Sequence, residues 1–237
     1  MSEPSSVATD GLRSRRYLAV VLVLVVAGNA AGTMIVEIVA GRMLAPYFGM
    51  SLYTWTTVIG VVLTGLALGH WAGGRLADAR PGRRAEALGL ACLAGAVTTI
   101  LVLPILYVVA GSLSAADVAV PTAIVVTGFA AFLIPSLTAG LVQPIATTFA
   151  LEALGSRAGR VVGRMLAAGV AGAILGTFLA GFVLISYLGS AGSIWLVAAL
   201  NAVLAALFVP AFRQRVVAWA LVAVAAADDL DLQQLEI

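Results

Sequence analysis

The feature of this sequence that most limits its fold is a series of long apolar runs separated by short polar loops. A membrane-spanning helix needs about 20 mainly apolar residues. Six segments meet that length, at residues 17–44, 52–75, 86–110, 119–149, 161–187 and 192–212. Hydrophobic residues make up 62% of the chain and charged residues only 10%, and a soluble domain of 237 residues cannot bury that much apolar surface. The sequence therefore predicts an all-α, polytopic membrane protein with six transmembrane helices.

The two ends of the sequence differ from the apolar runs. Residues 14–32 have the basic and apolar parts of a secretion signal, but the apolar run continues through Val36, so we interpret it as the first transmembrane helix. Residues 1–16 are predicted to form a disordered cytoplasmic N-terminus, and 17–212 the transmembrane domain. Residues 213–237 are predicted to form an interfacial or amphipathic segment and an acidic tail. Within them, residues 216–227 are too short for an ordinary span and favour a short docking helix.

Arginine placement predicts the orientation of the chain. The 13 basic residues are all arginines, and all but Arg42 lie before the first predicted span, after the sixth, or in the loops and adjoining span ends that a six-span topology places on the same side. Loops rich in arginine face the cytoplasm. We therefore expect both termini to be cytoplasmic. The net charge of +2 gives no reason to expect nucleic-acid binding.

Polar residues at helical spacing mark the first and fourth predicted spans. Asn29, Thr33 and Glu37 are four residues apart and share one face of the first helix, and Ser136 and Gln143 have helical spacing on the fourth. Two such faces indicate either a polar cleft for substrate or protons, or hydrogen bonds that hold the bundle together.

Glu37 is the single acid within a predicted span apart from Glu86, the first residue of the third. It would attract a cation or carry a proton, or else form a structural ion pair with Arg42. Arg42 would pair with Glu37 or extend to the outer surface.

Rows of small residues mark the second and fifth spans. Gly65, Gly69 and Gly73 repeat every four residues, as do Gly172 and Gly176. Such rows let helix backbones approach closely. The second and fifth spans hold equivalent places if the six helices form two inverted triplets. The rows therefore indicate ordinary tight packing, or a tight interface between these two spans or with a second subunit.

Residues that carry chemistry in other proteins are scarce. His70 is the single histidine and Cys92 the single cysteine, so we expect no metal site, no disulfide and no cofactor. His70 is expected near the inner surface, where it would hydrogen-bond close to the loop after the second span. The sequence contains neither a phosphate-binding loop nor a plausible set of catalytic residues, so we expect no enzyme activity and assign no catalytic residue.

Two stretches resemble known families. The loop GGRLADARPGRR (73–84) resembles the loop between the second and third helices of the major facilitator superfamily, in which an aspartate and arginines brace a cytoplasmic gate. That resemblance implies such a role for Asp78 with Arg75 and Arg83. The longer stretch EIVAGRMLAPYFGMSLYTWTTVIGVVLTGLALGHWAGGRLADARP (37–81) resembles the membrane region of bacterial spermidine synthase-like proteins, and a weaker likeness continues through 159–185.

The resemblance implies half of a facilitator in the bacterial inner membrane, which moves or handles a small solute such as a polyamine. Half of a facilitator would need a second copy, or a partner membrane or synthase chain, in addition to lipid. The alternatives are a membrane anchor or scaffold for a synthase or another complex, and a lipid-handling protein. Only residues 216–237 follow Arg215, too few for the synthase domain, so the catalytic residues of the family are not carried over.

Overall fold

The computed structural model describes residues 5–116, 118–154 and 158–208, which are helical apart from short turns. The helices are α1 (Ser5–Phe48), α2 (Leu52–Ala79), α3 (Arg84–Ala115), α4 (Val120–Leu154), α5 (Ala158–Leu179), the π-helical turn η1 (Ala180–Leu184), α6 (Ile185–Tyr187) and α7 (Gly189–Ala206). Six helical segments are long and apolar enough to cross a membrane, the fifth being built from α5, η1 and α6. The predicted all-α membrane protein with six spans is therefore confirmed.

The ends of the helices differ from the apolar runs that predicted them. α1 begins at Ser5, within the stretch expected to be disordered, and α2 continues past residue 75 to Ala79. Helices extend beyond the hydrocarbon because polar residues also form helix outside it. Residues 1–4 and the predicted C-terminal segment 213–237 lie outside the described residues.

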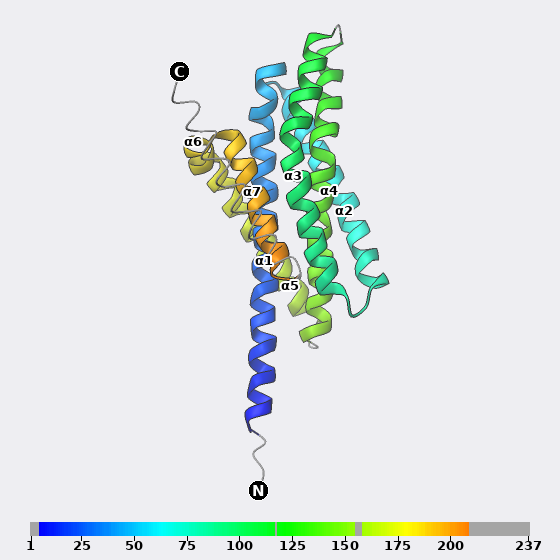
Figure 1. Cartoon of the computed structure of the whole chain (residues 1–237), viewed down its shortest axis with the longest axis vertical. Helices are drawn as coiled ribbons and strands as arrows, with labels where there is room; N and C mark the ends of the chain where they lie inside the picture. The colour runs from blue at the N-terminus through cyan, green and yellow to red at the C-terminus, as the bar shows by residue number, and fades with distance from the viewer. Residues whose placement is uncertain (1–4, 117, 155–157, 209–237) are drawn as a thin grey trace.

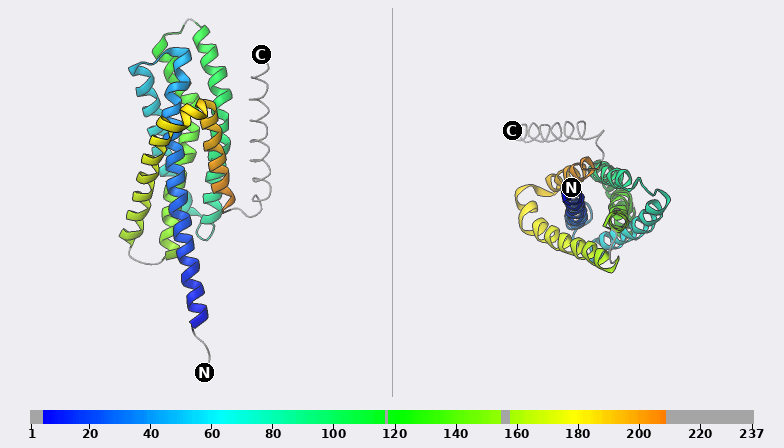
Figure 2. Two further views of the ribbon diagram at one scale, coloured as in Figure 1. Left: turned by 90° about the vertical axis from the view of Figure 1, so that its left-hand side faces the viewer. Right: turned by 90° about the horizontal axis from the view of Figure 1, so that it is seen from below.

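The helices form two triplets that interlock. Seen end-on, α1 and α4 lie inside a ring formed by the other helices (Figure 2). α2 packs most extensively on α4, the first helix of the other triplet, and α5 packs on α1 in the same way. α3 also packs on α4, α7 on α1, and α3 and α7 pack on each other. This exchange is the pattern that two inverted triplets produce.

The glycine rows make these exchanged contacts possible. A Cβ added at Gly73 would lie 2.7 Å from the carbonyl oxygen of Leu141 on α4, and one at Gly69 would overlap the carbonyl oxygen of Leu137. On α5, a Cβ at Gly172 would overlap the carbonyl oxygen of Ala27 on α1. Gly65 and Gly176 repeat the pattern one turn away. The prediction of tight packing is confirmed, but the prediction that the second and fifth spans meet is wrong, because each row faces the central helix of the other triplet.

The hairpin between α1 and α2 shows how the loops stay short. Gly49 has φ 76°, a left-handed conformation that glycine adopts without strain, and it follows the last residue of α1. Two residues later, the Ser51 hydroxyl accepts a hydrogen bond of 3.2 Å from the backbone N–H of Thr54 and caps α2. The turn therefore reverses the chain within a few residues, at the end of the bundle opposite to the α2–α3 turn (Figure 1).

We predict that Gly69→Ala lowers the free energy of unfolding by about 1–3 kcal/mol, because the added methyl group forces α2 away from α4. The matched control is Gly74→Ala on the same helix, where an added Cβ meets no atom within 4 Å. Unfolding in mixed detergent micelles with increasing dodecyl sulfate would measure both variants. Equal stability of the two variants would contradict the assigned contact.

Candidate functional site

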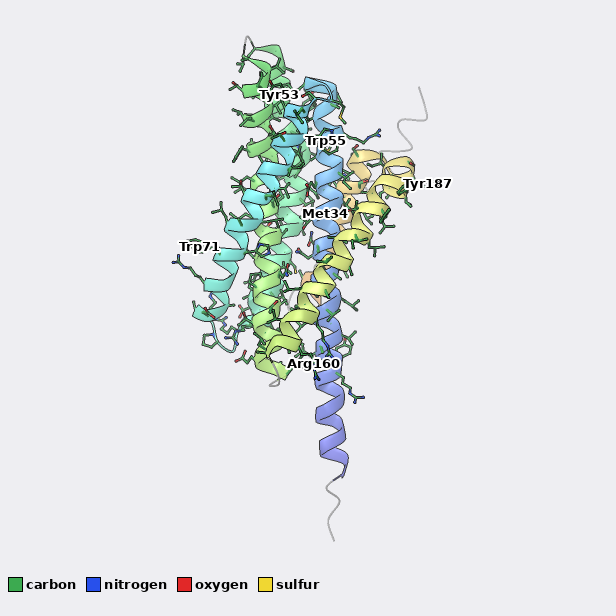
Figure 3. All side chains as sticks on the ribbon, turned by 180° about the vertical axis from the view of Figure 1, so that it is seen from behind. Met34, Tyr53, Trp55, Trp71, Arg160 and Tyr187 are labelled. Carbon is green, nitrogen blue, oxygen red and sulfur yellow. The ribbon has the colours of Figure 1, made fainter. Side chains whose placement is uncertain are left out.

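A groove opens on the face of the bundle between α2 and α5, which make no extensive contact with each other. Its volume is about 220 Å³ and its floor is the seam between α1 and α4. Figure 3 looks onto this face, with Met34 of α1 in the gap between α2 and α5. We call it the α2–α5 groove. Its polar wall residues are Asn29, Thr33, His70 and Gln143.

The polar groups of the groove come from three helices. Asn29 donates a hydrogen bond of 3.0 Å from its amide nitrogen to the carbonyl oxygen of Ala139, and so ties α1 to α4. The Thr33 hydroxyl donates to the carbonyl oxygen of Asn29 at 2.9 Å. Gln143 lies beside Gly169 of α5, where a Cβ would be 3.6 Å from its Oε1 atom. Within the described residues, the side chains of Gln143 and His70 have no hydrogen-bond partner, so they remain able to bind water or a solute.

His70 lies in this groove and not beside the loop after the second span. α2 continues to Ala79, so His70 is about 14 Å from the end of its helix. Its neighbour Gly69 contacts Leu137 and Gly140 of α4, beside the Ala139 carbonyl that binds Asn29. The described residues contain no hydrogen bond between His70 and the loop after α2, because the helix continues beyond the apolar run; the depth of His70 in the membrane stays a prediction.

Glu37 continues the same face of α1 one turn beyond Thr33. It is partly buried, and the next turn of this face is Gly41, which packs against Trp55 of α2. Arg42 is exposed, and neither of the two ion pairs in the described residues joins it to Glu37. A separation of five residues places two side chains about 140° apart around a helix, so the proposed pair does not form and Arg42 extends outward.

A second, smaller polar space lies on the other side of the α1–α4 seam. We call it the polar cavity. Its volume is about 20 Å³, enough for one water molecule. Its polar wall residues are Asn29 and Thr33 of α1, Thr99 of α3, Ser136 of α4 and Asn201 of α7.

Three of the side chains that face the polar cavity are buried and form no hydrogen bond within the described residues. Thr99, Ser136 and Asn201 are 3%, 4% and 7% exposed, and their polar side-chain atoms have no hydrogen-bond partner in the described part of the chain. Asn201 lies beside Gly95 of α3, where a Cβ would be 3.5 Å from its Cγ atom, an ordinary van der Waals contact. The helical spacing of Ser136 and Gln143 suggested that they line one site. Instead, Ser136 lines the polar cavity and Gln143 lines the groove. Thr99 gave no sequence signal, since a single threonine in an apolar helix is common.

The arginine-rich end of the bundle is held by a contact that the loop motif did not indicate. Arg84 forms an ion pair with Glu152 of α4 and donates a hydrogen bond of 3.1 Å from Nε to the carbonyl oxygen of Ala77. It thereby joins the end of α2, the start of α3 and the end of α4.

The three residues that the motif did indicate lie apart from this contact. Arg83 pairs with Glu86, while Arg75 lies 4.0 Å from the centre of the Trp71 ring. Asp78 is exposed and belongs to neither ion pair of the described ranges.

No group of three or more histidine, cysteine, aspartate or glutamate side chains suited to a metal ion occurs in the described ranges. Cys92 is buried in the bundle. Comparisons of the chain with protein-family models, with curated proteins and with solved structures find no match.

We predict that the polar side chains of the cavity are energetically coupled through a bound water molecule. Asn201→Leu and Thr99→Val should each lower the free energy of unfolding by about 1–3 kcal/mol, because each leaves the other's polar group without a partner. The double variant should lose less than the sum of the two. Unfolding of the four proteins in mixed micelles tests this. Strict additivity would show that the two side chains do not share a partner.

Proposed function

We propose that this chain is a membrane transport subunit that carries a small cationic solute along the α2–α5 groove. The observation that supports this proposal is the combination of an open groove, polar groups without partners at its floor, and one acid on the same helix face. Solute sites are concave and mainly apolar, with a few polar groups that orient the ligand. Gln143 and His70 would supply hydrogen bonds, and Asn29 and Thr33 would shape the floor.

Glu37 is the group that favours a cation. It is the single acid in the central part of any described span and lies one turn from the groove wall. An acid within the hydrocarbon is costly unless it binds a cation or a proton. A polyamine would satisfy it with an ammonium group, and the resemblance to spermidine synthase-like membrane regions also favours this class of solute.

The groove has the size of half a binding site. Its volume of about 220 Å³ is below the roughly 300–1,000 Å³ of most small-molecule sites. A second copy, or a partner membrane chain, would cover the open face and complete the site. In this proposal the arginine-rich end is cytoplasmic, the membrane is a bacterial inner membrane, and the ion pair between Arg84 and Glu152 holds the cytoplasmic end closed.

We predict that Glu37→Gln reduces uptake of labelled spermidine into proteoliposomes at least tenfold, because the variant keeps the shape of the side chain but removes its charge. The matched control is Glu86→Gln, which alters an exposed acid outside the groove whose ion pair contributes little to stability. Its uptake should equal that of the wild type.

Uptake would be measured with and without a pH gradient, and the fold of each variant checked by thermal unfolding. Equal uptake by wild type and Glu37→Gln would contradict the role of Glu37. No uptake by folded wild type would remove spermidine as the solute and favour the scaffold.

If a second copy covers the groove, residues on its rim should lie close to the partner. In a Cys92→Ala background, Val170→Cys places a thiol on the exposed rim of the groove, where Val170 is 61% exposed. Oxidation in the membrane should produce a disulfide-linked dimer. Tyr107→Cys, at a 74% exposed position on α3, is the control and should stay monomeric. Cross-linking of both variants to the same extent would show random collision instead of a specific interface.

A further inference from the structure

A separate crevice lies between α1 and α5, nearer the arginine-rich end than the α2–α5 groove. Its volume is about 210 Å³, and it shares no wall residue with that groove. We call it the α1–α5 crevice. Its walls are formed by Ala19, Val20, Val23 and Leu24 of α1, Leu154 of α4, and Val161, Arg164 and Met165 of α5. The wall is therefore apolar except for one guanidinium group.

The crevice exists because α1 and α5 separate between their close contact at Gly172 and the arginine-rich end. Gly172 brings the backbone of α5 against Ala27 of α1, but Arg164 and Met165 lie about two turns earlier, where no glycine row holds the helices together. Val20 and Leu24, at 57% and 59% exposed, remain open to the surroundings. The crevice is thus accessible from the side of the bundle that faces lipid.

Positive charge gathers at one end of the crevice. Arg164 lies in its wall, Arg160 lies one turn earlier on the same face of α5, and Arg16 lies one turn before Val20 on α1. All three are exposed, and neither ion pair in the described residues includes them. Figure 3 shows Arg160 at the lower end of α5. The first turn of α5 adds the positive end of its helix dipole.

The nearby acids do not offset this charge. At the same end of the bundle, Glu152 pairs with Arg84 and Glu86 pairs with Arg83. Asp78 lies near the end of α2 and is not in the crevice wall. An apolar crevice with uncompensated arginines at one end has the charge and shape complementary to a lipid with an anionic head group.

We propose that the α1–α5 crevice binds one anionic phospholipid, with its phosphate against Arg160 and Arg164 and an acyl chain between α1 and α5. Arg164 forms the boundary between the two parts of the ligand, because its aliphatic stem lines the apolar wall and its guanidinium reaches the head group. The lipid braces α5 against α1 where the backbones are no longer in contact. This proposal is independent of the α2–α5 groove and of transport.

The test is binding of phosphatidylglycerol to the full chain purified in detergent, with phosphatidylcholine of the same acyl chains as the neutral comparison. Native mass spectrometry counts bound lipids, and thermal unfolding measures stabilisation. We expect one retained phosphatidylglycerol and a rise in Tm that phosphatidylcholine does not produce. Equal retention of the two lipids would overturn the proposal.

Three variants separate the site from general attraction to the arginine-rich end. The double variant Arg160→Gln, Arg164→Gln should weaken phosphatidylglycerol binding at least tenfold, since each arginine raises the affinity for an anionic lipid surface by roughly a factor of five. Arg75→Gln with Arg80→Gln removes two exposed arginines outside the crevice and should leave binding unchanged. Val20→Trp fills the crevice, keeps every charge, and should also weaken binding.

Each of these outcomes decides part of the proposal. Equal loss of binding in the two arginine pairs would show a diffuse electrostatic effect and overturn the site. Unchanged binding in Val20→Trp would overturn the place of the acyl chain. Comparison of Tm without lipid identifies a variant that has failed to fold, and in that case Arg164→Gln alone gives the measurement.

Discussion

The architecture depends on direct contact between helix backbones at glycine. Gly69 lies against the backbone of α4, and Gly172 against that of α1. Within a bilayer, burial of apolar side chains gives little drive for helix association, because lipid is equally apolar. Close van der Waals packing and weak Cα–H···O contacts remain, and backbones approach closely enough for the latter where side chains are small or absent. Each row joins a helix of one triplet to the first helix of the other, so the triplets hold each other.

The same contacts keep one face of the bundle open. α3 and α7 pack on each other and close one side of the α1–α4 seam. α2 and α5 are each held by their glycines against a different central helix, and have no extensive contact across the other side. The groove with Gln143 and His70 is the result, whereas the smaller polar cavity with Asn201 lies on the opposite side.

The sequence predicts the spans and the packing positions, but not how they combine. Six apolar runs are sufficient to locate six helices, and four-residue glycine spacing shows that another backbone lies close. This spacing does not identify which helix supplies that backbone, so the prediction that the two glycine rows face each other is wrong. Ser136 and Gln143 share a face of α4, yet they lie in different spaces because α1 crosses α4 at Ala139, between them. Helix crossings depend on tertiary packing and leave no local pattern.

Two amide side chains make both spaces suited to water or a polar ligand. Gln143 lies in van der Waals range of Gly169 on α5, and Asn201 in van der Waals range of Gly95 on α3. An amide without a partner in an apolar medium costs several kcal/mol, roughly 2–7 depending on the reference state. The described chain supplies no side-chain hydrogen-bond partner for either, so both amides remain able to bind water or a solute. Asn29, Thr33 and Ala139 lie in the walls of both spaces. The Asn29–Ala139 hydrogen bond therefore lies between the groove and the polar cavity.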